Sequence, residues 1–151
     1  MSPLLPLAGR RILITRPRAQ AERLALALKA VGAEVLRLPT IEIHPPETYA
    51  HLDAVLEVIS GFDWLILTSV NGAEALADRM RFLRISPSKL HHLQVAAIGP
   101  ATAVAVEKIG LKIAVMPDEY VAEAVVACLR ERVAGQRVLL ARAAIGRDVI
   151  P

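Results

Sequence analysis

The chain is poor in aromatic residues, cysteines and long apolar runs, and each shortage excludes a class of protein. Only 3% of its 151 residues are aromatic, which argues against single-stranded nucleic-acid binding, because such proteins stack bases on aromatic rings. The one cysteine, Cys128, cannot form an internal disulfide, and this favours a reducing compartment. No apolar run approaches the roughly 20 residues that span a bilayer, and the N-terminus lacks a signal-peptide pattern. We therefore expect a cytoplasmic protein with no membrane segment.

The motifs of several well-known enzyme classes are missing as well. The chain has no G-x-G-x-x-G, Walker A or H-E-x-x-H motif, so a nicotinamide or ATP site has little support. No serine stands in a G-x-S-x-G elbow, which argues against a hydrolase of that type. The histidines are scattered, and the pair His91 and His92 lacks the partners of a zinc site. We predict no metal site.

What the sequence does contain is an alternation of short apolar runs and amphipathic stretches. A core rich in Leu, Val, Ile and Ala suits buried parallel strands covered by helices. Apolar spacing predicts strands at 11–15, 34–38, 64–68, 94–98, 112–115 and 137–140, and helices at 19–31, 49–60, 71–83, 101–109 and 120–133. This order predicts an α/β fold with a doubly wound parallel sheet and helices on both faces. On the inner helix faces we expect Leu24, Ala27, Leu28 and Val31 in the first helix, and Cys128 in the last.

A stretch bounded by prolines, residues 39–46, interrupts this alternation. Proline restricts its own backbone and that of the preceding residue, so the stretch cannot be helical. We interpret it as a connector between domains. Residues 1–38 are then the opening β-α unit of a first domain, and residues 47–151 are most of a second.

The chain stops at residues 145–151, where a helix begins without a body, so we expect the remainder of the first domain to be missing. The opening unit must then cover its apolar stripe in another way. It docks onto the second domain, swaps between chains to give a dimer, or stays mobile.

Candidate ligand residues follow the predicted strands, because open parallel sheets bind ligands beyond the carboxyl ends of their strands. Ser69 and Asn71 are good N-cap residues, and Pro100 suits the first helical position after Gly99. The N–H groups at such helix starts favour anions. The same residues could equally serve only as caps, and Tyr120 could either donate a hydrogen bond or simply pack.

Charge is unevenly distributed along the chain. Residues 1–38 carry seven basic side chains against two acidic ones, residues 39–129 are net acidic, and the tail is basic again. Solvated arginines on helix faces explain this pattern. A positive rim for an anionic ligand is the alternative. No basic run is dense enough to indicate nucleic-acid binding.

An ordered set of motifs carries a family resemblance that extends from residue 9 onward. It comprises residues 14–17 (ITRP), 38–45 (LPTIEIHP), 63–72 (DWLILTSVNG), 98–103 (IGPATA), 115–117 (VMP), 119–123 (EYVAE) and 138–143 (VLLARA). Each motif is weak alone, but in this order they resemble the N-terminal part of uroporphyrinogen-III synthases. The family's fold has two similar α/β domains joined by a two-stranded connector, and the chain returns from the second domain to finish the first.

The resemblance implies an activity in haem, sirohaem and cobalamin biosynthesis. The family cyclises hydroxymethylbilane, a linear tetrapyrrole with eight carboxylates, with inversion of ring D, and needs no cofactor. The substrate-binding residues that it implies here are Thr15, Arg16, Ser69, Val70, Asn71, Gly99, Pro100, Ala101, Thr102, Tyr120, Ala122 and Arg142. No catalytic acid is assigned, because the family's tyrosine of that role would lie in the missing part.

Two other functions compete with this one. A non-catalytic ligand-binding or regulatory module could share the fold. A nucleotide-binding enzyme of the doubly wound class is the other rival, and the missing glycine fingerprint argues against it.

Overall fold

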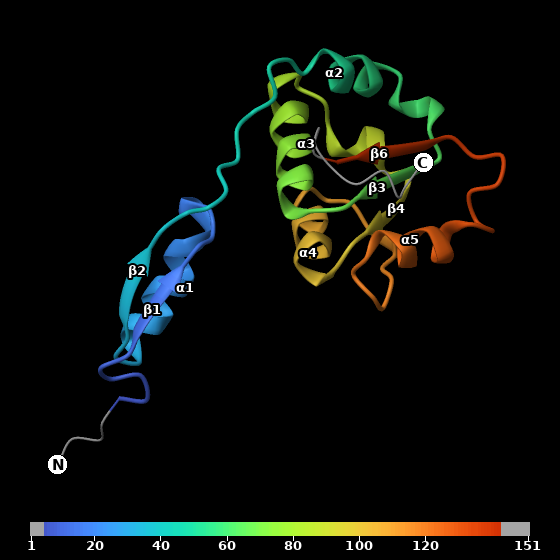
Figure 1. Ribbon diagram of the computed structural model, residues 1–151. Coiled ribbons are helices and arrows are strands. Elements are labelled where there is room, and N and C mark those ends of the chain that lie inside the picture. Colours follow the sequence, from blue (N-terminus) through green and yellow to red (C-terminus); the bar gives the residue numbers. More distant parts are fainter. Residues whose placement is uncertain (1–4, 143–151) are drawn as a thin grey trace. The chain divides into compact units, whose positions relative to one another are not determined.

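The computed structural model describes residues 5–142, and the chain divides between Glu47 and Thr48 into two units, each of which is described by itself (Figure 1). Unit 1 contains β1 (Arg11–Ile14), α1 (Arg18–Ala30) and β2 (Glu34–Arg37). The two strands pair in parallel, with Leu13 opposite Leu36. α1 ends as its glycine predicts. Gly32 has a φ of +96° and donates a hydrogen bond to the Lys29 carbonyl.

The contact between α1 and the two strands is narrow. Ala21 and Ala25 on α1 are fully buried against Ile14 of β1, and Leu28 and Val35 pack at the margin of this contact. The predicted inner face was partly wrong, because Leu24 is 40% exposed and Ala27 is also exposed. The two-stranded sheet is narrow, and the stripe of α1 with Ala21 and Ala25 covers it. The neighbouring stripe with Leu24 therefore remains exposed to solvent.

The other face of the β1–β2 sheet is left open by residues 5–47, the described part of unit 1. Leu13, Leu36 and Leu38 are 54%, 49% and 60% exposed. Parallel strands are normally buried on both faces. Residues 41–46, which follow, form neither helix nor strand, as their prolines require.

Unit 2 holds one four-stranded sheet within the described residues. Its strands are β3 (Trp64–Leu67), β4 (Gln94–Ala97), β5 (Ile113–Val115) and β6 (Val138–Ala141). All pairs are parallel and the order is β5-β4-β3-β6, so the chain moves outward from β3 in one direction and then returns to its other side. This is the doubly wound parallel arrangement that the sequence predicts.

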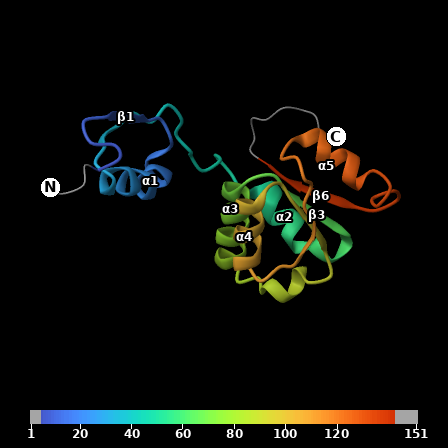
Figure 2. The same cartoon turned by 90° about the horizontal axis from the view of Figure 1, so that it is seen from below.

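Helices cover both faces of this sheet, as Figures 1 and 2 show. On one face lie α2 (Ala50–Glu57), α3 (Val70–Phe82) and α4 (Pro100–Lys108), with 3₁₀ helices at Ile59–Gly61 and Pro87–Leu90. On the other lies α5 (Ala122–Leu129).

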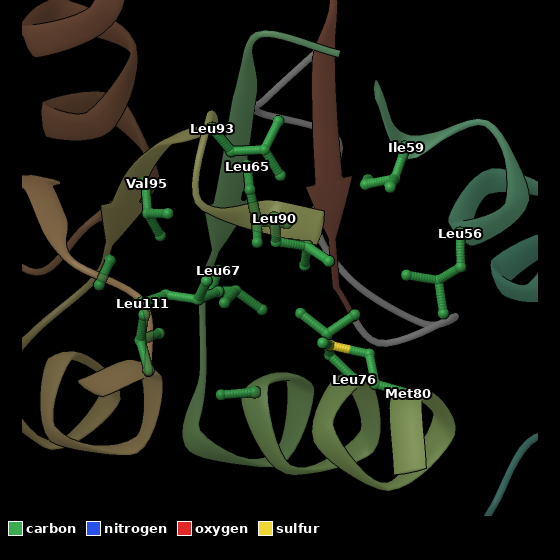
Figure 3. Close-up of a cluster of buried hydrophobic side chains, with 13 residues drawn as sticks. Leu56, Ile59, Leu65, Leu67, Leu76, Met80, Leu90, Leu93, Val95 and Leu111 are labelled. Atoms are coloured by element: carbon green, nitrogen blue, oxygen red, sulfur yellow. The ribbon is translucent and has the colours of Figure 1, made fainter. Parts of the chain in front are cut away.

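The alternation of side chains along β3 builds two cores. Leu65 and Leu67 point to the side of α3, where they meet Leu76, Met80 and other apolar side chains (Figure 3). Trp64 and Ile66 point to the other side, where α5 contributes Val125 and Leu129. Because every residue of β3 is buried, this strand is an uninterrupted apolar run.

The structure differs from the sequence predictions in the length of α5 and in the exposure of Cys128. The predicted helix at 120–133 is shorter, because Val121 is extended and caps the helix and Arg130 ends it. Cys128 is exposed rather than buried, whereas Val125 and Leu129 face the core. The predicted helix start at 145–151 lies outside the described residues.

No helix in the described part of the chain is both long and apolar enough to cross a membrane.

Candidate ligand site at the strand ends

The strand ends of unit 2 meet at one edge because all its strands run in the same direction. Leu67, the last residue of β3, pairs with Ala97 of β4 and with Ala141 of β6. The turns that leave these strands therefore lie side by side. They contain most of the residues that the sequence predicts as ligand-binding.

The β3–α3 turn is built around Ser69. Its backbone is extended, and its Oγ accepts a hydrogen bond from the Gly72 N–H at 3.1 Å. This is the N-cap role that the sequence predicts. Val70 and Asn71 are the first two residues of α3 and are half-buried. A Cβ on Gly72 would lie 3.4 Å from the carbonyl oxygen of Ala141, so this turn also abuts the end of β6.

The β4–α4 turn depends on the backbone of Gly99. Its φ of +81° and ψ of 157° fall in a region that is essentially restricted to glycine. Pro100 then occupies the first turn of α4, as predicted, and Ala101 is exposed beside it. Thr102 is only 4% exposed, so its side chain contributes little surface at the edge.

The β5–α5 loop reaches the β4–α4 turn through Tyr120. Its Cγ lies 3.5 Å from the place where a Cβ of Gly99 would stand, so the ring packs on this glycine. The ring is still 57% exposed. Ala122 is the first residue of α5, and Arg142, which is exposed, follows β6.

Thr15 and Arg16 belong to unit 1, where they follow β1 and are exposed. The carbonyl of Thr15 accepts hydrogen bonds from the backbone N–H and the hydroxyl of Thr40. The structure thus brings the predicted residues of unit 2 together at one edge. Thr15 and Arg16 belong to the separate unit 1.

The helix starts at this edge differ in charge. The first turns of α3 and α4 contain no acidic side chain, whereas the first turn of α5 carries Glu123. N–H groups in the first turn of a helix have no acceptor within it and carry a partial positive charge. The edge near α3 and α4 therefore suits anions better than the edge near α5. Among residues 5–142, no three His, Cys, Asp or Glu side chains gather to hold a metal ion.

One feature next to this edge was missed from the sequence. A groove of ≈ 450 Å³ lies between α3 and α4, and its lining includes Val70 and Ala101 in the first turns of these helices. Ala73 and Ala77 on α3 and Ala105 on α4 form part of its wall. The signal in the sequence was the spacing of alanines four positions apart, Ala73 and Ala77 in one predicted helix and Ala101 and Ala105 in another.

These features define a doubly wound α/β protein with a candidate ligand edge at its strand ends, and comparisons with known proteins assign it more closely. The family model for uroporphyrinogen-III synthase HemD matches residues 22–151. The chain therefore belongs to the uroporphyrinogen-III synthase family.

Similar proteins carry the same description. A uroporphyrinogen-III synthase of Synechococcus elongatus is 39% identical over 93% of this chain and 53% of its own length. The porphyrin biosynthesis protein HemD of Ruminiclostridium josui is 31% identical over 96% of this chain and 29% of its own length. The chain thus spans about half or less of these curated relatives.

A solved structure has the same fold. The uroporphyrinogen III synthase of Thermus thermophilus matches with a TM-score of 0.51 and 19% identity, over 89% of this chain and 62% of that one.

Proposed function

We propose that this chain supplies part of a uroporphyrinogen-III synthase, which closes hydroxymethylbilane into uroporphyrinogen III. The observation that carries the proposal is the family match over residues 22–151. The strand-end edge supports it, because two helix starts without acidic side chains suit a ligand with many carboxylates. We also place the enzyme in the cytoplasm, which suits a chain with one cysteine.

The reaction that we propose needs positioning more than acid–base power. The terminal hydroxyl leaves as water, ring D is attacked at its substituted carbon, and the spiro intermediate reopens and recloses with that ring inverted. Ring closure without enzyme gives the uninverted isomer. The protein therefore has to hold the substrate so that one closure geometry is favoured.

In this scheme the backbone at the edge of unit 2 binds substrate carboxylates. The turns at residues 69–71 and 99–102 offer backbone N–H groups at the starts of α3 and α4. Arg142 provides a cation that stays charged and can bind a carboxylate with two hydrogen bonds. Thr15 and Arg16 would serve from the first domain, whose opening unit is unit 1.

We further propose that the 151-residue chain does not form the type III isomer by itself. The described residues of unit 1 form a sheet of two strands, and Leu13 and Leu36 on its open face are about half exposed. A wall of the substrate cleft that is built on such a unit lacks the support that parallel sheets require.

An isomer assay tests both statements. Hydroxymethylbilane is incubated with the chain alone, and with the chain plus the part of the Synechococcus elongatus relative that lies outside the matched region. The products are then separated by chromatography. We expect the spontaneous isomer I from the chain alone and isomer III from the mixture. Isomer III from the chain alone would refute the second proposal.

Absence of isomer III from the mixture, together with tight binding of a tetrapyrrole octacarboxylate, would favour a non-catalytic binding module of the same fold. Thermal shifts with that ligand and with NAD distinguish this module from a nucleotide-binding protein.

A further inference from the structure

We propose that the ring of Tyr120 is an apolar platform that holds a pyrrole ring of the substrate by its face, beside the amides that hold the carboxylates. The inference rests on the function proposed above. It assigns Tyr120 a role through its ring rather than through its hydroxyl.

The few aromatic residues of the chain lie in different surroundings. Trp64 is 6% exposed in the core, Phe62 lies 4.7 Å beneath the guanidinium of Arg137, and Tyr49 and Phe82 flank that of Arg79. Phe82 is 71% exposed but lies against Arg79, whereas the Tyr120 ring packs on the backbone of Gly99 at the strand-end edge and the residue keeps 57% of its surface exposed. An aromatic ring that is left open at a ligand edge has apolar area available for a partner.

The ring of Tyr120 lies against the turn that precedes α4. Three of its carbons lie 3.5–3.8 Å from the Cβ position of Gly99, the residue that precedes α4. The apolar surface is therefore continuous with the turn that offers N–H groups. Met116 and Val121, in the same loop, are 45% and 42% exposed and extend the apolar character of this loop.

The proposed substrate combines flat rings with carboxylates. Each of its pyrrole units joins a flat apolar ring to carboxylate side chains. Flat rings pack well on aromatic faces, and carboxylates accept hydrogen bonds from backbone N–H groups. A surface with both features side by side fits one such unit, whereas the α5 start with Glu123 does not suit a second carboxylate.

The test is a binding titration of the 151-residue chain with uroporphyrin, a stable oxidised tetrapyrrole with eight carboxylates. The variants are Tyr120→Phe, which keeps the ring, and Tyr120→Leu, which removes it. The control is Tyr49→Leu, because Tyr49 caps α2 and packs on Arg79 in the third turn of α3, away from the edge. A second probe, butanetetracarboxylate, has carboxylates but no ring.

We expect Tyr120→Phe and Tyr49→Leu to bind uroporphyrin within about twofold of the wild type, and Tyr120→Leu to bind about tenfold more weakly. Binding of butanetetracarboxylate should be the same in all four proteins. The unfolding midpoint of Tyr120→Leu should equal that of Tyr120→Phe, which excludes a loss through misfolding.

The contrary outcomes separate the two proposals. Equal uroporphyrin affinity of Tyr120→Leu and wild type would overturn the platform and leave the proposed function intact. Equal loss in Tyr120→Phe and Tyr120→Leu would assign the effect to the hydroxyl and also overturn it. A wild-type chain that does not bind uroporphyrin would count against the proposed ligand, and the platform would fall with it.

Discussion

The guanidinium of Arg79 on α3 donates two hydrogen bonds to the carboxylate of Asp53 on α2. The same guanidinium lies over two rings, 5.0 Å from the centre of Tyr49 and 4.2 Å from that of Phe82. One side chain thus links the start of α2 to the last turns of α3. Because α3 begins at the strand-end edge, this cluster helps to fix the helix that carries the Ser69 cap.

The ion pair predicts a specific dependence of stability on pH. The hydrogen bonds from Arg79, and then its charge, lower the pKa of Asp53 below its usual value. A lowered pKa stabilises the folded state above the unfolded pKa of about 3.9, and this contribution is lost as pH falls through the folded value. In urea unfolding followed by Trp64 fluorescence, Asp53→Asn should be less stable than wild type at pH 7 and pH 5, and the difference should shrink at pH 3.

Asp78→Asn is the matched control for this prediction. Asp78 pairs with Arg81 on the same helix, but its side chain is 72% exposed. Exposed pairs contribute about 0–1 kcal/mol, so this variant should stay close to wild type at every pH. A difference between Asp53→Asn and wild type that does not change with pH would contradict the assignment.

Two glycines at the strand-end edge should respond in opposite ways to alanine. Gly99 has a φ of +81°, where a side chain costs about 1–3 kcal/mol. Gly72 lies in the first turn of α3, and its new Cβ would make only ordinary contacts, the nearest at 3.4 Å. Gly99→Ala should therefore lower the free energy of unfolding, and Gly72→Ala should leave it unchanged or raise it by up to about 1 kcal/mol. Equal losses in both variants would show that crowding, and not backbone conformation, limits this edge.

Features that depend on local backbone preferences could be predicted from the sequence. The Ser69 cap, Pro100 after Gly99, and the glycine at the end of α1 follow from backbone preferences alone. The apolar run of residues 64–68 predicted a strand, and every residue of β3 is buried. These features were enough to predict the sheet and the turns that follow its strands.

Features that depend on how much of a helix face finds a partner could not be predicted in this way. Leu24 lies open because α1 packs through Ala21 and Ala25, and an apolar pattern does not tell which of two adjacent stripes makes the contact. Cys128 is exposed for the same reason. The packing of Tyr120 on Gly99 joins two loops 21 positions apart, and no local pattern encodes it.

The cap on α3 gives a third prediction. Ser69→Ala removes the hydroxyl that accepts from the Gly72 N–H and should lower the free energy of unfolding by about 1 kcal/mol. Ser69→Asp keeps an oxygen in the same place and adds a negative charge at the helix start, so it should retain wild-type stability. Trp64, buried in unit 2, reports both by fluorescence. Equal loss in the two variants would mean that the turn needs serine for another reason.

The open face of unit 1 gives the last prediction. Leu13 and Leu36 lie opposite each other on β1 and β2, and both are about half exposed. Burial of such a face is worth roughly 25 cal/mol per Å², so we expect copies of the 151-residue chain to associate through it. The mass measured by light scattering should rise with concentration for the wild type. It should stay at the monomer value for the double variant Leu13→Lys, Leu36→Lys, because two charges cannot be buried without partners. Val58→Lys, at a position of unit 2 that is 55% exposed, should associate as the wild type does. A wild-type chain that is monomeric at all concentrations, with β1 and β2 amides that exchange without protection, would show instead that unit 1 stays mobile in solution.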